Sequence, residues 1–510
     1  MGCCSQKLWI ICLSASGVVL LVLGLAFGVC EVFDKLINEN VDKDVQLKPG
    51  SLVYKEWIKP SVPIYMKYFV FNVTNPDEVM EGLEIPNVTQ IGPYSYRELR
   101  SNEVLNWSSE HSIVTFMPNR KFIFDPETSC DGCDDKNDTF VTVNIPLLTL
   151  ALKLKNTDLQ NYSTCLPAVQ MLADAYQVRL FQSKSVYDLL WGYTDPLLNT
   201  IVNVQSDICP RNSSKGVSSF VQLQRNNTYE GIISMNTGQK NISKLEQFIM
   251  WRGQTHLTWW SDKYANMING TDGTQFAPRV LENDKLYVFS PDICRSMYLT
   301  YEKTVIVKNI KLYRYIAPDK GYLSGDIYPP NKGFCVPPRC LPTGLLNVSL
   351  CKPMNPPVVI SPPHFYQSNK SLLNTVNGLD PVKSAHGTHL DVEPITGIVM
   401  QAAKRVQLNV ALESVNTTRQ TTGKFKPVFL PVMFAAESAL ITDKKAEEFR
   451  IKVYGAIQLL DIGQYALLGI GIVCILLAAV VFVYHKKTSN NYDCTDKEKK
   501  PLLLHEGNRG

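Results

Sequence analysis

The sequence predicts a mainly β protein of the α+β class, with one large antiparallel domain between two terminal membrane-spanning helices. Long apolar runs without charged residues lie near both ends of the 510-residue chain. Between them, segments rich in β-branched and aromatic residues follow one another without the strand–helix alternation of a parallel α/β sheet. We therefore expect one large β domain that both ends of the chain anchor in a membrane.

The first apolar run extends from Leu8 to Cys30. A helix of about 20 apolar residues can cross a bilayer. The alternative is a cleaved signal peptide, whose apolar core is usually about 7–15 residues long. This run is longer, and Phe33, Leu36 and Ile37 continue its helical spacing. The run therefore predicts an uncleaved anchor over residues 8–30.

The second apolar run covers residues 465–484, and a histidine and two lysines follow it. Basic residues favour the cytoplasmic side of a membrane, and Lys7 precedes the first run. We expect residues 1–7 and 485–510 to be cytoplasmic tails. Residues 31–464 then form one domain on the lumenal side.

Glycosylation sequons of the form Asn-x-Ser/Thr are dense in this domain. A single match is a weak signal, but their density predicts a heavily glycosylated ectodomain. The candidate asparagines are Asn72, Asn87, Asn106, Asn137, Asn161, Asn212, Asn226, Asn241, Asn269, Asn347, Asn369 and Asn416.

The cysteines agree with a lumenal location, because an even number of them in an oxidising compartment predicts disulfides. They are Cys130, Cys133, Cys165, Cys209, Cys294, Cys335, Cys340 and Cys351. Cys130 and Cys133 form a CDGC motif. A zinc site would need a second pair or histidines, and a redox site would need a surrounding βαβ unit. We therefore favour a bridge within a small surface loop.

Strand signals recur through the domain. Val62–Val73 combines β-branched and aromatic residues. Residues 111–126 hold two such runs around Pro118 and Asn119, which predicts a hairpin. Further candidate strands are residues 304–317, 405–412 and 426–434.

One segment, at about residues 145–205, is helical in character. Apolar residues recur at helical spacing over 168–182, and Pro167 suits the first turn of a helix there. The apolar face of this helix belongs either to the core, which is the simpler interpretation, or to a partner.

We find no sequence signature of catalysis. The chain has no nucleophile elbow, no H-E-x-x-H motif and no phosphate-binding loop, so we expect neither an enzyme nor a cofactor. His386 and His389 lie near Asp391, but a pair without further organised ligands favours a surface loop over a metal site. The net charge of +4 is not concentrated in a basic block, so no nucleic-acid partner is expected.

Local motifs resemble those of the class B scavenger receptor family, in order and over nearly the whole chain. They are IGPYSYRELR from Ile91, LLWGYTDPLL from Leu189, NMINGT from Asn266, SPDICRSMY from Ser290, GFCVPPRC from Gly333, PPHFYQ from Pro362, DVEPITG from Asp391 and QAAKRVQLNV from Gln401. The segment from Gly333 and the tail are most similar to a lysosomal member. The resemblance implies an antiparallel β-barrel with a helical bundle distal to the membrane and an internal lipid tunnel.

The resemblance also implies Cys294–Cys351 and Cys335–Cys340 bridges. A further bridge of the family should be absent, because Ala265 stands where other members have a cysteine. A Cys165–Cys209 pair would be an additional bridge of the bundle.

The short cytoplasmic tail carries an apolar cluster that no nearby core can bury. Glu498, Leu502 and Leu503 fit an acidic dileucine signal, which a clathrin adaptor would bind with a basic patch and an apolar pocket. The alternative is an unstructured tail that merely ends in apolar residues. The signal predicts residence in lysosomes and late endosomes, with passage through the plasma membrane. Cys3 and Cys4, beside the first span, are candidates for palmitoylation.

Two functions fit this resemblance. In the first, the chain is a receptor that carries a lysosomal hydrolase, such as an acid β-glucosidase. In the second, it binds and transfers cholesterol or phospholipid through the tunnel. The alternative to a lysosomal receptor is a cell-surface scavenger receptor for lipoprotein or lipid ligands, and a homo-oligomer is compatible with each.

Cargo would bind at the apex of the bundle, through Met171, Leu172, Ala175 and Val178. This region departs from the family pattern at Asn161, Cys165 and Pro167. No histidine occurs between His111 and His256, so release by acid cannot depend on an apical histidine.

Overall fold

The computed structural model describes residues 3–29, 32–156, 159–203, 219–220, 226–229, 231–336, 339–352 and 355–497. The chain divides into two compact units. One consists of Met1–Lys43 and Lys444–Gly510, and the other of Asp44–Asp443. We describe each unit by itself.

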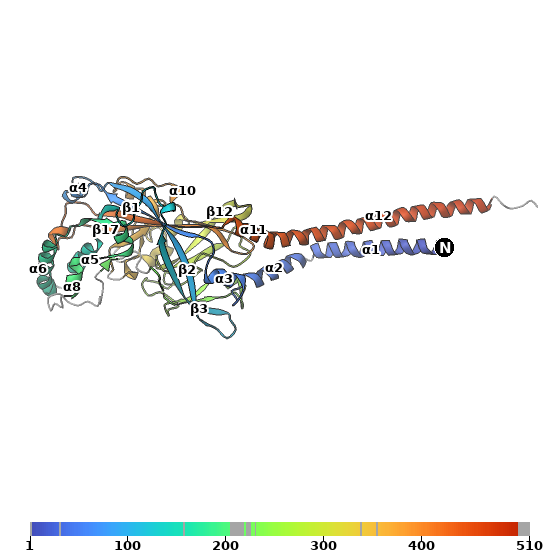
Figure 1. The fold of residues 1–510 in the computed structure, drawn as a ribbon, viewed down its shortest axis with the longest axis horizontal. Helices are drawn as coiled ribbons and strands as arrows, with labels where there is room; N and C mark the ends of the chain where they lie inside the picture. Colours follow the sequence, from blue (N-terminus) through green and yellow to red (C-terminus); the bar gives the residue numbers. More distant parts are fainter. Residues whose placement is uncertain are drawn as a thin grey trace, which may run out of the picture. The chain divides into compact units, whose positions relative to one another are not determined.

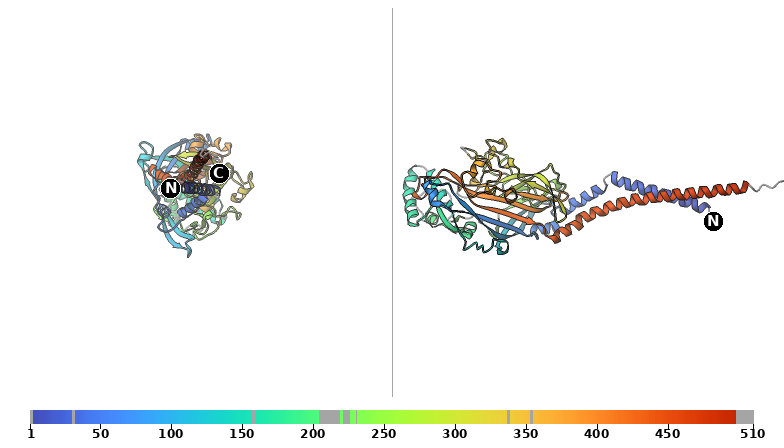
Figure 2. Two further views of the ribbon diagram at one scale, coloured as in Figure 1. Left: turned by 90° about the vertical axis from the view of Figure 1, so that its right-hand side faces the viewer. Right: turned by 90° about the horizontal axis from the view of Figure 1, so that it is seen from above.

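The terminal unit contains two long helices that run side by side, α1 (Cys3–Val29) and α12 (Gly455–Lys497) (Figure 2). Both are long and apolar enough to cross a membrane, within the segments Leu8–Ala26 and Asp443–Lys487. The helices approach each other closely at glycines. A Cβ atom added at Gly471 would lie 3.1 Å from the carbonyl oxygen of Gly17. Small residues at such a contact let two membrane helices pack backbone to backbone.

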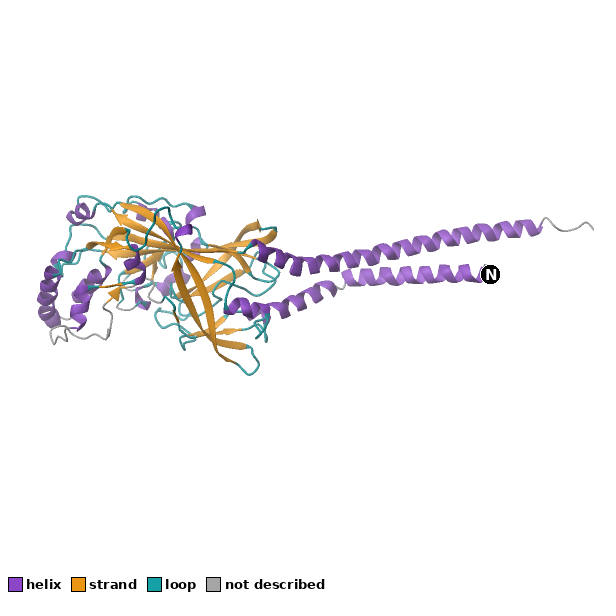
Figure 3. Ribbon diagram, viewed as in Figure 1, coloured by secondary structure: helices purple, strands orange, loops and turns teal. Residues whose placement is uncertain are grey.

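The larger unit is built around one antiparallel sheet (Figures 1 and 3). Its main strands follow the spatial order β10-β9-β3-β2-β1-β18-β17-β16-β13-β12-β11. The bounds are β10 (Phe248–Trp251), β9 (Ile233–Asn236), β3 (Ile113–Phe124), β2 (Val88–Trp107), β1 (Ile64–Val73), β18 (Val428–Leu440), β17 (Val399–Leu412), β16 (His389–Val392), β13 (Ile310–Ile316), β12 (Arg295–Val307) and β11 (Lys285–Ser290). Short strands β8 (Thr228–Tyr229), β14 (Leu346–Asn347) and β15 (Val358–Ser361) pair at its margins.

The two outermost strands of this order are joined by a short link, Gly270–Thr271. The amide of Phe248 in β10 donates to the carbonyl of Gly270 at 2.9 Å, and the amide of Phe289 in β11 donates to the carbonyl of Thr271 at 2.9 Å. Only glycine fits at position 270, where φ is +105° and an added Cβ would lie 2.2 Å from the carbonyl oxygen of Tyr287. These hydrogen bonds close the sheet into a barrel.

Helices gather at one end of this barrel (Figure 1). They are α5 (Ile145–Lys155), α6 (Leu159–Ala175), α7 (Val186–Trp191) and α8 (Pro196–Asn203), and the paired strands β4 (Thr139–Val143) and β5 (Phe181–Ser185) accompany them. Among the short helices, α3 (Leu52–Ile58) precedes the first strand, and α4 (Pro76–Glu81), α9 (Lys370–Leu373) and α10 (Lys383–His386) lie between strands. Two further helices, α2 (Val32–Val45) and α11 (Asp443–Phe449), cross the boundaries between the units.

The helix predicted over residues 168–182 begins and ends earlier. α6 starts at Leu159 and includes Pro167 in its interior. It ends at Ala175 because Gln177 has a positive φ of 48°, after which residues 181–185 pair with β4. The apolar spacing therefore identified the helix but misplaced both of its ends.

The hairpin predicted at Pro118–Asn119 is wrong. Residues 113–124 form one continuous strand, β3, because the 20-residue β2 pairs along its whole length. Pro118 falls between the parts of β3 that pair with β9 and with β8, a position that a strand tolerates more readily than one within a fully paired stretch.

Candidate functional site: the charged interior of the barrel

One face of four neighbouring strands carries charged side chains. Met66 of β1 pairs directly with Tyr96 of β2 on one side and with Glu437 of β18 on the other. Glu437 in turn pairs with Lys404 of β17. Residues directly opposite each other project from the same face of a sheet. These four side chains therefore share one face.

That face is the inside of the barrel. The ammonium group of Lys404 donates to the carbonyl oxygen of Asp272 at 3.0 Å. Asp272 directly follows the closing link, which is far from β17 in strand order. Arg120 of β3 likewise reaches Asp292, beyond the end of β11, at 3.3 Å. The Lys404 contact joins strands that are far apart in the sheet order, as expected across the interior of a closed sheet, whereas the Asp292 side chain is 68% exposed.

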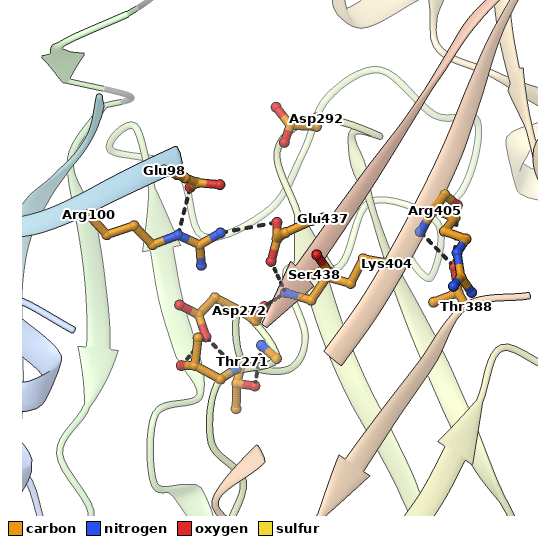
Figure 4. Close-up of polar contacts among 12 residues, drawn as sticks. Glu98, Arg100, Thr271, Asp272, Asp292, Thr388, Lys404, Arg405, Glu437 and Ser438 are labelled. Carbon is orange, nitrogen blue, oxygen red and sulfur yellow. Dashed lines mark hydrogen bonds and ion pairs between the residues drawn. The ribbon is translucent and has the colours of Figure 1, made fainter. Parts of the chain in front are cut away.

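Two cations and two carboxylates form a network on this interior face (Figure 4). Arg100 Nε lies 2.7 Å from Glu98 Oε1, and its Nη2 lies 3.0 Å from Glu437 Oε2. Lys404 Nζ lies 3.5 Å from Glu437 Oε1. The side chain of Glu98 is fully buried, whereas those of Arg100 and Glu437 are 18% and 14% exposed. The network is thus enclosed but still reachable by small molecules.

Glu437 and Arg100 of this network stay ionised. Burial alone would raise the pKa of Glu437, but the charges of Arg100 and Lys404 outweigh it and lower that pKa to about 2. Burial also opposes the charge of Arg100, yet Glu437 and Glu98 raise its pKa above the ordinary value. Both partners therefore keep their charges in neutral and in acidic compartments.

The pKa of Glu246, unlike that of Glu437, is raised. Glu246 is buried, and Thr274, three residues after the closing link, donates to its carboxyl group at 3.4 Å. Burial, with a further contribution from Asp272, raises its pKa to about 8. Glu246 is consequently protonated and neutral at acidic pH.

Two buried polar atoms, one in the network and one on a neighbouring strand, have no hydrogen-bond partner among the described residues. They are the hydroxyl of Tyr68 and Oε2 of Glu98, and both side chains are buried. The burial of Tyr68, followed by the charge of Glu98, raises the pKa of its hydroxyl, so it remains a donor. Buried polar groups are normally satisfied. Together this donor and this acceptor could serve a polar group that enters the barrel.

The sequence matches the model of the CD36 family over residues 15–482. The chain belongs to this family. The match runs from the first apolar helix, through the whole barrel, to the second apolar helix.

Lysosome membrane protein 2 of Mus musculus is 32% identical over 455 residues, which are 89% of this chain and 91% of the relative. The protein of the same name from Homo sapiens has the same identity and coverage. Scavenger receptor class B member 1 of Rattus norvegicus is 34% identical over 485 residues, or 94% of this chain and 91% of the relative. The family resemblance drawn from the sequence motifs is confirmed. These names favour a receptor over an enzyme, and with the two apolar helices they fit a lysosomal two-pass membrane protein.

The structure of this CD36-family chain joins six of the cysteines named above. The pairs are Cys130–Cys133, Cys294–Cys351 and Cys335–Cys340. Cys209 lies outside the described residues, as does the side chain of Cys165.

Most of the candidate glycosylation sites are at the surface. The exposed asparagines are Asn87, Asn106, Asn137, Asn226, Asn241, Asn369 and Asn416, while Asn72, Asn269 and Asn347 are half-buried. Asn212 and the side chain of Asn161 lie outside the described residues.

The four residues proposed for cargo binding do not form one surface. On α6, Met171 is 66% exposed and Ala175 is also exposed. Leu172 and Val178 instead pack against a small core formed by Leu147, Ala173 and Leu197. Only the first two could contact a partner without unfolding this core.

The expectation that His386 and His389 occupy a surface loop is wrong. His386 is buried, and its ring stacks on that of His364 with centroids 4.3 Å apart. Its Nδ1 accepts a hydrogen bond from the amide of Val382 at 2.9 Å. The rings of His364 and His386 both pack against Phe434, and this packing buries His386. Within the described ranges, no group of three His, Cys, Asp or Glu side chains could hold a metal ion.

The proposed sorting residues Glu498, Leu502 and Leu503 lie outside the described residues. Cys3 and Cys4 belong to the first turn of α1, and their side chains also lie outside the description.

Sequence reasoning missed the interior network. Its only local signal is the alternation of charged residues in YRELR, within a run that is otherwise a strand. Glu98 and Arg100 are two residues apart, so they project from one face. The sequence does not reveal that Glu437 and Lys404 complete the network.

Proposed function

We propose that the chain is a lysosomal and endosomal receptor of the class B scavenger type that binds lipid, such as cholesterol or phospholipid, inside its barrel and transfers it. The barrel carries this proposal, because its interior presents the charged network and two polar atoms that have no hydrogen-bond partner within the described ranges. An apolar chain that leaves a membrane for water loses about 0.8 kcal/mol for each exposed CH₂. A covered interior path lowers that barrier without an enzymatic step.

The interior suits an amphipathic ligand. The interior face of β2 and β3 presents Tyr96 and Phe122, which can pack against an apolar body. Two residues along β2, Glu98 Oε2 can accept a hydrogen bond, and the Tyr68 hydroxyl can donate one. A sterol hydroxyl both donates and accepts, so it could satisfy both atoms.

A matched pair of alanines tests the transfer of lipid through the barrel. Ala435 lies two residues from Glu437 on the same face of β18, directly opposite Tyr68. Its neighbour Ala436 points to the other face because side chains alternate along a strand. We expect Ala435→Trp to fill the interior and abolish transfer of a photoreactive cholesterol analogue from vesicles to the chain. Ala436→Trp should transfer the analogue normally.

Both variants must first show glycans that have matured beyond the endoplasmic reticulum, which demonstrates folding. Unchanged transfer in a folded Ala435→Trp variant contradicts a route through the barrel. The reverse pattern, with loss only in Ala436→Trp, would assign the route to the outer face.

A second candidate function is the capture of a lysosomal hydrolase, such as an acid β-glucosidase. The observation that favours it is an exposed apolar patch on and just after α6, formed by Met171, Ala175 and Tyr176. Asp174 forms an ion pair with Arg419, which fixes the same helix against the loop at residues 419–421. The helix that presents the patch is therefore joined to this neighbouring segment by an ion pair and a hydrogen bond.

Met171→Asp tests this docking surface, since the side chain is exposed and the change should not disturb folding. We expect immunoprecipitation of the variant to recover at least about tenfold less hydrolase, the effect of losing about 1.4 kcal/mol of binding free energy. Met171→Leu should capture normally. Capture that persists with Met171→Asp and with Tyr176→Asp would remove this function and leave lipid transfer.

A further inference from the structure

A segment of residues 378–387, which we call the strap, runs between two attachment points on the barrel. Just before it, the carbonyl of Asn377 accepts a hydrogen bond from the amide of Val88 at 3.0 Å. Just after it, the hydroxyl of Thr388 accepts one from the amide of Arg405 at 2.9 Å (Figure 4). The two ends of the strap are therefore fixed, one at β2 and the other at β17.

One side chain of the strap is buried. It belongs to His386, and the rest of the strap, which is described throughout, is exposed or half-buried. The His386 ring stacks on that of His364, with centroids 4.3 Å and planes 12° apart. Both rings pack against Phe434 of β18, whose neighbour Ala435 faces the interior. The histidine pair therefore holds the strap against the outer face of the barrel.

His364 is the fixed member of the pair. Its amide donates to Gln407 Oε1 of β17 at 2.7 Å, and its Nε2 lies 2.6 Å from Gln90 Oε1 of β2. Its Nδ1 accepts a hydrogen bond from the amide of Asp380, in the strap, at 3.0 Å. Because Nδ1 accepts, the proton of the neutral ring is on Nε2, which donates to Gln90. A second proton can bind only at Nδ1.

The same holds for His386, whose Nδ1 accepts a hydrogen bond from the amide of Val382. A protonated imidazole donates from both nitrogens. A proton on Nδ1 would therefore face an amide N–H, and that hydrogen bond would be lost. In His364 the lost bond is the one from the Asp380 amide, which ties the strap to the barrel. Two charged rings at stacking distance would also repel each other.

The charges around the pair oppose its protonation while the strap is attached. Burial lowers the pKa of His364 to about 4, and the neighbouring His386 adds to this effect. Burial, followed by the charge of Arg405, lowers the pKa of His386. Asp380 acts in the opposite sense on both rings, but more weakly. The side chains that contact the pair from β1, β2 and β18 are uncharged, and they are Phe71, Gln90 and Phe434.

Another contact of the strap does not respond to mild acid. Lys383 forms an ion pair with Glu302 of β12, and the hydrogen bond from Lys383 lowers the pKa of that carboxyl group. The Lys383 side chain is 63% exposed, and exposed ion pairs contribute little to stability. The histidine pair is therefore the acid-sensitive attachment of the strap.

We infer that the strap is a pH-sensitive device: protonation of His364 and His386 in an acidic compartment detaches it from the barrel and exposes the outer face at Phe434. A detached histidine has its ordinary pKa of about 6.5, whereas that of the attached His364 is about 4. Detachment is therefore favoured at least about tenfold more at about pH 5 than at about pH 7. This inference does not depend on the transfer of lipid.

Hydrogen exchange, measured by mass spectrometry on the full-length protein in detergent, tests the detachment. After correction for the intrinsic effect of pH on exchange, we expect residues 378–387 to exchange at least about tenfold faster at about pH 5 than at about pH 7. Peptides from β17 should keep their protection, which separates local detachment from global unfolding. Equal protection of the strap at both pH values, or a parallel loss in β17, would overturn the inference.

His386→Asn and His364→Asn locate the response. The asparagine oxygen can accept the amide hydrogen bond in place of Nδ1, but it takes up no proton at these pH values. Asparagine also tolerates the positive φ of 53° at His364. Each variant should reduce the pH response at least about threefold, while His256→Asn, at an exposed histidine, should respond like the wild type. An unchanged response in both variants with mature glycans would overturn the inference, and if neither variant matures, the wild-type measurement decides.

Discussion

Glu437 holds two cations inside the barrel, Arg100 at 3.0 Å and Lys404 at 3.5 Å. A buried ion network contributes little net stability compared with an apolar core, but removing one member leaves the others unpaired. Replacing a single member of the network is therefore expected to destabilise the protein.

We expect Glu437→Gln to lower the free energy of unfolding by about 3–5 kcal/mol, because two enclosed cations lose their shared carboxylate. Chemical denaturation of the purified chain measures the change. Glu413→Gln is the control, since Glu413 pairs with Lys155 in an exposed ion pair with side chains 40% and 51% exposed. That variant should lose less than about 1 kcal/mol. A similar loss in both variants would show that Glu437 contributes no more to stability than a carboxylate in an exposed ion pair.

Two histidines make the stability depend on pH. Burial lowers the pKa of His364 and of His389 to about 4, and Arg314 contributes at His389. Their unfolded-state pKa is about 6.5, so the unfolded chain binds more protons below that value. The free energy of unfolding should therefore fall as the pH falls from about 6.5 towards 4, by up to about 1.4 kcal/mol per pH unit for each histidine.

His389→Leu tests this dependence, because Nε2 of His389 is buried without a hydrogen-bond partner among the described residues. Unfolding measured at about pH 7 and about pH 5 should show a smaller acid loss than in the wild type, while the lowered pKa values of His364 and His386 preserve the rest of the loss. An unchanged loss would mean that other groups determine the pH response. Glu246 acts in the opposite sense, since its raised pKa of about 8 costs stability as the pH rises from about 4.5.

At the scale of elements, the barrel depends on the short link that joins β10 to β11. A Cβ at Gly270 would lie 2.2 Å from the carbonyl oxygen of Tyr287, within the backbone of β11. We expect Gly270→Ala to prevent closure and to leave the protein in the endoplasmic reticulum with immature glycans.

Gly132→Ala is the matched control. It also has a positive φ, of 71°, but nothing lies within 4 Å of an added Cβ. Its cost should be limited to the backbone strain of about 1–2 kcal/mol, and its glycans should mature. Endoglycosidase sensitivity distinguishes the two variants, and normal maturation of Gly270→Ala would contradict the closing role of the link.

The two terminal helices pack through glycine, which an engineered cross-link can test. A Cβ at Gly17 would lie 3.1 Å from the Cβ of Cys474. Disulfide-bonded cysteines have Cβ atoms about 3.5–4.5 Å apart. The added Cβ would also lie 2.7 Å from Cγ1 of Ile475, so the helices must shift slightly apart, and that shift brings the two cysteines into the disulfide range. We expect Gly17→Cys to cross-link to the native Cys474 under mild oxidation. The N- and C-terminal fragments then stay together after proteolysis of the intervening domain. Val19→Cys, at a position 56% exposed, should not cross-link.

At the scale of the whole molecule, the proposed destination depends on the tail at residues 498–510, which lies outside the described residues. Replacing both Leu502 and Leu503 by Ala should move the steady-state protein from lysosomes to the cell surface, because an adaptor would lose the roughly 1.5–3 kcal/mol that burial of each leucine supplies. Surface biotinylation and lysosomal staining measure the shift. Glu506→Ala, in the same tail but outside the motif, is the control. Unchanged lysosomal staining with both leucines removed would reject the sorting signal.

The sequence alone determined what depends on local pattern. Uncharged runs near both ends predicted the two apolar helices, since span length follows from bilayer thickness. The run at residues 304–317 became the β12–β13 hairpin, where Lys308 and Asn309 supply the positive φ angles of a tight turn. The family followed from motifs distributed along the chain. Each of these signals lies within a short window of residues.

Only the tertiary structure decided which distant residues meet. Glu98 and Glu437 are far apart in sequence, and each alone is an ordinary charged strand residue. They share Arg100 because the register of β1 with both β2 and β18 places them on one face. The stacked histidine rings likewise meet where both pack against Phe434 of β18. Strand order and register depend on pairing across the whole barrel, and a window of sequence contains no information on that pairing.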